Sequence, residues 1–226
     1  MNKLPIEKQI QVIQLLLEGI GLKSASAQAD VSINTTTKLL LSVGKACEKF
    51  HHLKVKGLTH KLVALDQIWS IRDTHSKMDL DNIQGTHGNH DIWTWVAVGD
   101  EDKIVLSWYV GSKDSCSENI IVKDIFTRTC DTAQLVWKSN PKAHKPTIAV
   151  HQRIYPDKPS TKKREEKITN LYYALALHFV YFNFCKIDQA SNFTPAMRAG
   201  IIQTVMNVED IIGLLENNLK GAHNIN

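Results

Sequence analysis

The sequence predicts an α/β protein in which a small helical module is followed by a sheet domain. Residues 1–58 read as three helices separated by short turns, because apolar or small side chains recur there at helical spacing. Residues 62–71, 92–98 and 104–110 are short apolar runs bounded by turn residues, which is typical of consecutive strands. At 226 residues the chain is long enough for one medium domain and one small one.

The helical module has the order of a helix-turn-helix. Apolar side chains recur over residues 6–17, and a shorter helix over 22–29 is rich in small residues. The tight turn 30–32 follows, after which Ser32 or Asn34 can cap a third helix. Three helices with a short turn between the second and the third are the layout of a helix-turn-helix domain.

The sheet domain is predicted over residues 59–190. Its second and third strands form a hairpin, because the polar segment 99–103 between them has turn composition. A helix over 117–128, a short strand over 133–137 and a long helix over 166–185 follow. Three antiparallel strands, a helix, a further strand and further helices are the element order of a ribonuclease-H-like domain.

In the last third of the chain the sequence predicts a loop and a carboxy-terminal tail. Residues 138–163 are polar and contain four prolines, which predicts a poorly ordered loop within an incomplete domain. Residues 191–226 are predicted to be a carboxy-terminal helical tail, with its last helix over 207–219.

Basic residues are concentrated at the amino terminus. Residues 1–61 hold nine lysines and four acids, a net charge of +5, whereas the whole chain carries +4. A basic module on a near-neutral body favours nucleic-acid binding by that module. A solvated lysine-rich helical face is the alternative that charge alone leaves open.

The first turn of the third helix carries polar side chains suited to DNA. In a helix-turn-helix this turn enters the major groove. Asparagine can pair with adenine, threonine can hydrogen-bond a base or contact a thymine methyl, and lysine can meet a phosphate. The candidate DNA-binding residues are Asn34, Thr35, Thr36, Thr37 and Lys38. Lys54, Lys56 and Lys61 could extend the phosphate contacts, and a helix cap with its solvated face is the alternative.

One acid, Asp66, interrupts the apolar run over residues 62–70. A carboxylate in a buried strand loses its hydration, and this costs free energy unless a cation or a hydrogen-bond donor meets it. Asp66 is therefore a candidate metal ligand. The alternative is an aspartate that is paired or capping within the fold.

Several separated motifs resemble those of the DDE transposases of bacterial insertion elements, in the group that opens with a helix-turn-helix. The segment 66–70, Asp-Gln-Ile-Trp-Ser, is similar to the motif around that family's first catalytic acid. Further similar segments are 1–5, 31–35, 38–40, 91–97, 107–111, 174–179, 181–184 and 194–200. They occur in the family's order and cover most of residues 1–129 and 161–219.

The resemblance implies a function in DNA transposition. Such enzymes cleave and rejoin phosphodiesters, and two divalent metals, Mg²⁺ or Mn²⁺, activate the attacking oxygen and stabilise the leaving one. Asp66 would be the first metal-binding and catalytic acid. The implied partner is double-stranded DNA at the element ends, with a homo-oligomer as a further possibility and no membrane.

The chain departs from the family at the other two acids. The turn that carries the second acid is missing after the helix over 117–128, and the motif of the third acid is missing from residues 147–163. Asp131, Glu165 and Glu166 are the remaining acids that could stand in as metal ligands. One carboxylate cannot hold two metals, so we expect catalysis to be impaired. The alternative is a transposase-derived regulator that binds DNA and represses transposition without catalysis.

The cysteines and the amino-terminal residues indicate in which cellular compartment the protein is expected. Cys47, Cys116, Cys130 and Cys185 are widely spaced and form no Cys-x-x-Cys pair, which predicts reduced thiols. The first residues lack the pattern of a signal peptide. We therefore expect a cytoplasmic protein, and the resemblance implies a bacterial one associated with the nucleoid.

Overall fold

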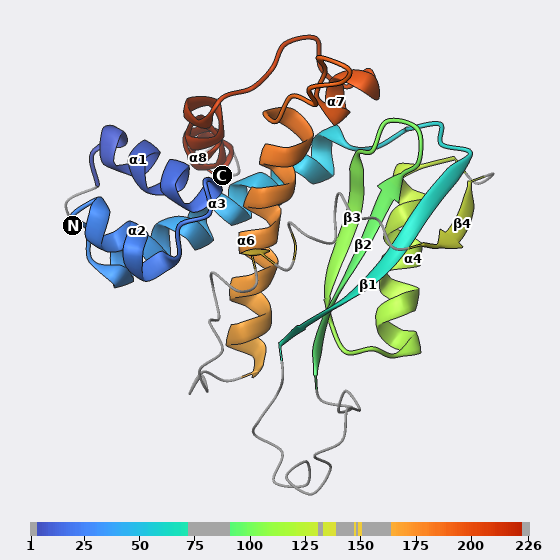
Figure 1. Ribbon diagram of the computed structural model, residues 1–226, viewed down its shortest axis with the longest axis horizontal. Helices are drawn as coiled ribbons and strands as arrows, with labels where there is room; N and C mark the ends of the chain where they lie inside the picture. Colours follow the sequence, from blue (N-terminus) through green and yellow to red (C-terminus); the bar gives the residue numbers. More distant parts are fainter. Residues whose placement is uncertain are drawn as a thin grey trace, which may run out of the picture. The chain divides into compact units, whose positions relative to one another are not determined.

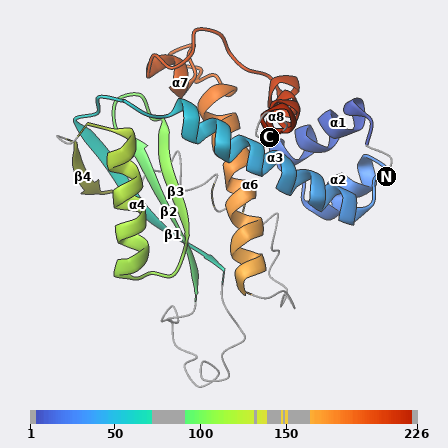
Figure 2. The same ribbon diagram turned by 180° about the vertical axis from the view of Figure 1, so that it is seen from behind.

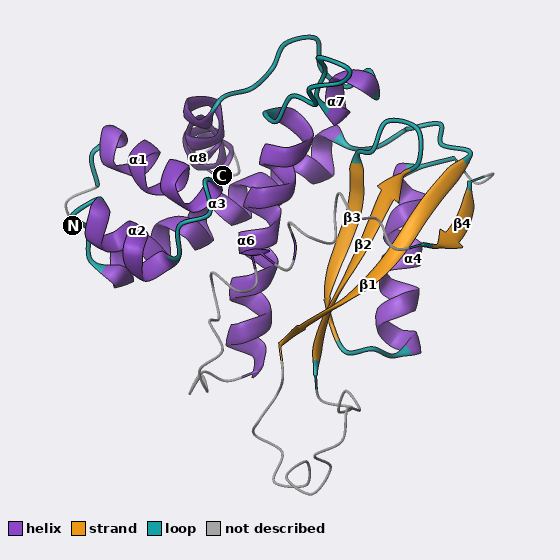
Figure 3. Cartoon of the chain, in the orientation of Figure 1, coloured by secondary structure: helices purple, strands orange, loops and turns teal. Residues whose placement is uncertain are grey.

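The computed structural model describes residues 4–71, 91–130, 133–138, 147, 149–150 and 164–222. Over these residues the chain is a mixed α/β protein with seven helices and a four-stranded mixed sheet (Figures 1 and 3). It divides into two compact units. A helical unit is formed by residues 1–55 and 173–226, and a sheet unit is formed by residues 56–172.

The helical unit begins with the three helices that the sequence predicts. They are α1 (Ile6–Leu17), α2 (Leu22–Gln28) and α3 (Ile33–Lys54). Later parts of the chain complete the unit: the second part of α6 (Arg164–Phe184), the short α7 (Pro195–Arg198) and α8 (Val208–Ala222). The carboxy-terminal helix α8 packs against α3 and α1 (Figure 2).

The turn between α2 and α3 has a defined geometry. Asp30 has a φ of 52°, a left-handed conformation that aspartate tolerates better than most side chains. Ser32 then caps α3, because its Oγ accepts the backbone N–H of Thr35 at 3.2 Å. Of the two candidate caps, the structure uses Ser32.

Helix α3 buries one face completely. The apolar residues of this face include Leu40, Val43 and Cys47. Gly44 lies against α6, where a Cβ atom would overlap the backbone carbonyl of Tyr173, so only glycine permits this close approach. Beyond it, the Phe50 and Phe184 rings pack edge to face with centroids 4.9 Å apart.

The sheet unit contains four strands in the order β3-β2-β1-β4. Strand β1 (Leu62–Ile71) pairs antiparallel with β2 (Ile92–Gly99), and β2 pairs antiparallel with β3 (Val105–Gly111). The short strand β4 (Gln134–Trp137) pairs parallel with β1. The predicted strands are thus confirmed, with ends shifted by at most one residue.

Helix α4 (Ser115–Arg128) connects β3 with β4 and lies against one face of the sheet in Figures 1 and 2. It begins at the cap Asp114, whose carboxylate accepts the backbone N–H of Ser117 at 2.8 Å. On this face the Trp95 and Trp137 rings lie 5.9 Å apart and join β2 to β4. A parallel neighbour such as β4 requires this kind of helical crossover.

The first part of α6 belongs to the sheet unit and contacts the opposite face. Its Tyr172 ring lies 5.8 Å from the ring of Trp108 on β3. The predicted loop 138–163 lies almost entirely outside the described residues, which include only positions 138, 147, 149 and 150 of it.

Candidate functional site

Asp66 lies in the middle of β1 and is 8% exposed. It pairs with Val96 on β2, and Val96 pairs with Trp108 on β3. Directly paired residues project to the same face of a sheet. Asp66 therefore projects to the face that the first part of α6 contacts, away from α4.

The residue beside Asp66 at the end of β4 is a lysine. Trp137, the last residue of β4, pairs with Leu65, and the backbone N–H of Lys138 donates to the Leu65 carbonyl at 3.1 Å. One step further along both strands, Lys138 lies next to Asp66. The Lys138 side chain is 61% exposed, and its Nζ lies 3.9 Å from Asp100 Oδ1.

The first turn of α6 presents its acids to solvent. Glu165 and Glu166 are both exposed, whereas the next residue, Lys167, is only 2% exposed. The buried charged group at the start of this helix is therefore a cation. Sequence reasoning missed Lys167, and nothing in the local pattern separates it from the lysines of the preceding loop.

Among the described residues, the remaining candidate acids Glu165 and Glu166 belong to no group that could hold a metal ion. Asp131 lies outside the described residues. Within the ranges that the structure describes, no group of three His, Cys, Asp or Glu side chains could hold a metal ion. A two-metal site needs converging carboxylates, and the residue that follows β4 beside Asp66 is Lys138 rather than an acid. The described residues alone therefore do not fit a pair of Mg²⁺ or Mn²⁺ ions.

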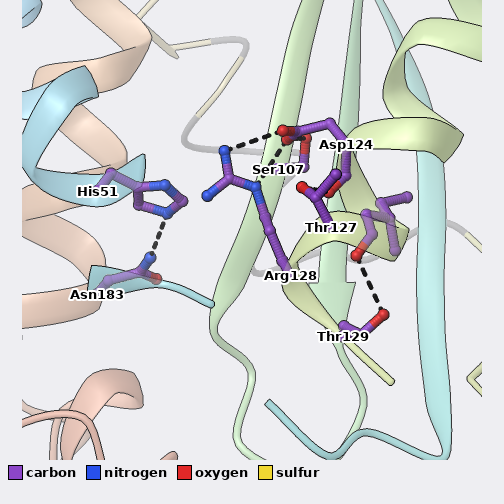
Figure 4. Close-up of polar contacts among 8 residues, drawn as sticks. His51, Ser107, Asp124, Thr127, Arg128, Thr129 and Asn183 are labelled. Atoms are coloured by element: carbon purple, nitrogen blue, oxygen red, sulfur yellow. Dashed lines mark hydrogen bonds and ion pairs between the residues drawn. The ribbon is translucent and has the colours of Figure 1, made fainter. Parts of the chain in front are cut away.

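Asp124, another acid of the sheet unit, takes part in hydrogen bonds and an ion pair within the fold (Figure 4). Its carboxylate accepts hydrogen bonds from the Ser107 hydroxyl at 2.5 Å and from Arg128 Nε at 2.7 Å. Arg128 Nη2 also donates to the other oxygen at 3.2 Å. This network fastens α4 to β3, so Asp124 is not a substitute metal ligand. The i, i+4 spacing of Asp124 and Arg128 in the sequence could have predicted this ion pair.

The amino-terminal turn of α3 presents only part of the predicted DNA-binding set. Asn34, Thr35 and Lys38 are exposed. Thr36 is fully buried, and its Oγ1 atom has no hydrogen-bond partner. Thr37 is half-buried and donates its hydroxyl to the Ile33 carbonyl at 2.8 Å. The Thr36 side chain faces the core one turn before Leu40, so it is not part of the exposed polar surface of this turn.

Two histidines that sequence reasoning left aside make buried contacts. In the helical unit, His51 Nε2 lies 3.4 Å from the Asn183 amide nitrogen (Figure 4). In the sheet unit, His60 Nε2 lies 2.8 Å from Asp102 Oδ2, and Asp102 Oδ1 accepts the backbone N–H of Ile104 at 3.1 Å. These contacts fix the ends of α3 and of the β2–β3 hairpin, and we assign them structural roles.

Comparison of the chain with models of known protein families and with curated proteins finds no match. None of the helices that the structure describes is both long enough and apolar enough to cross a membrane.

Proposed function

We propose that this chain is a DNA-binding protein of DDE-transposase descent whose sheet unit is impaired in phosphodiester chemistry. The observation that carries the proposal is the capped amino terminus of α3. There Asn34, Thr35 and Lys38 are exposed together at the end of a long helix in a basic module. A helix end of this composition suits entry into the major groove of DNA.

The arrangement of α1, α2 and α3 supports a helix-turn-helix in that role. Helix α2 and α3 are separated by a short turn, and each packs against its neighbours within the unit. In this motif the helix after the turn reads base edges while the preceding one crosses the backbone. We assign base contact to Asn34 and Thr35 and phosphate contact to Lys38.

The sheet unit supports descent from a ribonuclease-H-like nuclease. Its first three strands are antiparallel, its fourth is parallel to β1, and α4 provides the crossover. A buried acid, Asp66, occupies the middle of β1. The likeness rests on strand order and direction, and on the motif at residues 66–70.

The residue next to Asp66 at the end of β4 supports impaired catalysis. Phosphodiester transfer with two divalent metals requires at least two converging carboxylates. Lys138 follows β4 beside Asp66, and Lys167 is buried in the first turn of α6. The position next to Asp66 at the end of β4 therefore offers no carboxylate, and Lys138 Nζ lies 3.9 Å from Asp100 Oδ1. Mg²⁺ or Mn²⁺ would be held only if acids outside the described residues converged on Asp66.

The same observations favour a second candidate function, which is repression. A protein that occupies the element ends without cutting them, or that forms mixed oligomers with an intact relative, blocks access for the active enzyme. DNA occupancy would then be the biological activity of the chain.

A two-part experiment tests the proposal. A gel-shift assay measures binding to a duplex taken from the DNA flanking the gene, and a nicking assay in Mn²⁺ uses supercoiled plasmid carrying the same DNA. We expect binding without nicking, and Asp66→Asn should bind equally well. Nicking by the natural chain that disappears in Asp66→Asn would contradict impaired catalysis, and absence of binding would contradict the DNA-binding function.

A further inference from the structure

The outer face of α3 carries lysines well beyond its first turn. At about 100° of rotation per residue, Lys38, Lys45 and Lys49 fall on one side of the helix together with Asn34. The fully buried residues, such as Leu40, Val43 and Cys47, lie on the opposite side. We call Lys38, Lys45 and Lys49 the α3 lysine row.

The lysine row is exposed, and its charge is not neutralised. All three side chains are exposed, and the ion pairs of the described part of the chain join other residues. Two other lysines do have partners: Lys103 lies 3.2 Å from Asp100 Oδ1, and Lys8 donates to the Ala29 carbonyl. Three lysines in one line, with Glu48 as the one acid of this helix, give its outer side a net positive charge.

The one acid of α3 is the half-buried Glu48, which lies about one turn after Lys45, and the exposed acids of the described helical unit lie on other segments. Glu209 and Asp210 are exposed in the first turn of α8, a helix that packs against α3. Since α3 buries the face opposite its lysine row, α8 does not cover the row. A polyanion is therefore attracted to the outer face of α3 and repelled by the start of α8.

The distance from Asn34 to Lys45 along α3 is compatible with contacts to the phosphates that flank the major groove of a DNA duplex. A rise of about 1.5 Å per residue places Lys45 about 16 Å beyond Asn34 along the helix axis. The major groove is about 12 Å wide. With Asn34 at the base edges, Lys45 and Lys49 would lie past the groove, where the phosphates of its wall begin.

We propose that Lys45 and Lys49 form a phosphate-binding track for double-stranded DNA, continuous with the contact of Lys38. This inference rests on the proposed DNA-binding function and extends it to a second set of residues. The first turn of α3 discriminates between sequences, while the rest of the helix supplies affinity that is independent of sequence. Neither Lys45 nor Lys49 belongs to the DNA-reading turn of the motif.

The salt dependence of DNA binding distinguishes direct lysine–phosphate contacts from a general effect of positive charge. Each phosphate that a lysine neutralises contributes about −0.9 to the slope of log K against log [salt] for duplex DNA. We would measure binding of a fluorescent random-sequence 24-base-pair duplex by anisotropy between about 50 and 200 mM salt. The variants are K45Q/K49Q, N34A, and K186Q as the matched control, since Lys186 is an exposed lysine at the end of α6 in the same unit.

We expect the slope for K45Q/K49Q to become less steep by about 1.8, with affinity reduced on the order of ten-fold at 0.1 M salt. The slope for K186Q and for N34A should not change. Glutamine preserves helix propensity, and circular dichroism and thermal unfolding would verify the fold of each variant.

An unchanged slope in K45Q/K49Q, while the natural chain binds DNA, overturns the track and leaves the proposed function intact. Equal loss in K186Q also overturns it, because the effect would then be one of net charge. If the natural chain binds no duplex even at low salt, both proposals fail. Equally tight binding to an RNA duplex of the same sequence overturns the assignment to DNA, because the deep, narrow major groove of RNA does not admit a helix.

Discussion

The backbone N–H of Lys138 donates to the carbonyl of Leu65 at 3.1 Å, which places a lysine next to Asp66 across the parallel strand pair. Trp137 and Leu65 share the face that α4 covers, so the following residue on each strand projects to the other face. The residue next to the buried acid is therefore a lysine rather than a second acid, and the Nζ of this lysine lies 3.9 Å from Asp100 Oδ1.

This relationship predicts that one substitution creates a metal site. Lys138→Asp removes the exposed cation, whose side chain is 61% exposed, and adds a carboxylate beside Asp66. We expect millimolar Mn²⁺ to raise the Tm of this variant by about 3 °C, because an ion that binds only the folded state stabilises it. The natural chain should show no shift. A shift of the same size in the double variant D66N/K138D would mean that the ion binds elsewhere.

The buried hydroxyl of Thr36 predicts a stabilising substitution. Its Oγ1 atom has no hydrogen-bond partner, and an unsatisfied buried polar group costs about 1–3 kcal/mol. Thr36→Val keeps the shape and the branched Cβ and removes that cost. We expect the free energy of unfolding in urea to rise by about 1 kcal/mol, with DNA affinity unchanged.

Thr37→Val is the matched control for this substitution. Thr37 donates its hydroxyl to the Ile33 carbonyl near the helix surface, so its replacement should change stability by no more than about 0.5 kcal/mol. Loss of DNA affinity in Thr36→Val, with the fold intact, would restore Thr36 as a contact residue.

The sequence predicts the elements of this chain well because their patterns are local. Strand β1 follows from one apolar run, and α3 follows from a polar cap ahead of apolar residues at helical spacing. Burial within the capped turn was not predictable in the same way. Four consecutive polar residues, Asn34 to Thr37, carry no sign of which one faces the core; the register of α3 against its neighbours decides this.

Contacts between segments that are far apart in the sequence could not be predicted from the sequence. The parallel pairing of β4 with β1 joins residues about seventy positions apart, and only that register identifies Lys138 as the neighbour of Asp66. The grouping of residues 173–226 with the amino-terminal helices likewise depends on contacts between distant segments. Periodicity describes one element at a time, so it predicts neither relationship.

Thiol reactivity tests the packing between α3 and the end of α6. Burial and the nearby Cys185 raise the pKa of Cys47, and burial and the neighbouring Asp210 raise the pKa of Cys185 to about 12. Since the thiolate is the nucleophile, neither cysteine should react with iodoacetamide at pH 8. Exposed Cys116 should be modified, as mass spectrometry of digested protein would detect.

The same pKa direction gives a dependence of stability on pH. The ordinary pKa of a cysteine is 9.0, and the folded-state value of Cys185 is higher. Its contribution to stability is therefore complete below pH 9 and declines as pH rises from 9 toward 12.

In the thiol-labelling experiment, rapid modification of Cys47 by iodoacetamide at pH 8 without denaturant would contradict the burial of Cys47 between α3 and α6.

The close approach of α3 to α6 predicts a severe effect from a single methyl group. A Cβ atom at Gly44 would overlap the carbonyl oxygen and the Cβ of Tyr173, and a backbone atom cannot move aside as a flexible side chain can. We expect Gly44→Ala to lower the free energy of unfolding by about 3 kcal/mol, the cost of overpacking a core. Gly213→Ala in α8 is the matched control, because a Cβ there meets no atom within 4 Å. It should stabilise the chain by about 0.5–1 kcal/mol through helix propensity. Equal effects of the two substitutions in urea unfolding would mean that α3 and α6 are not in contact at Gly44.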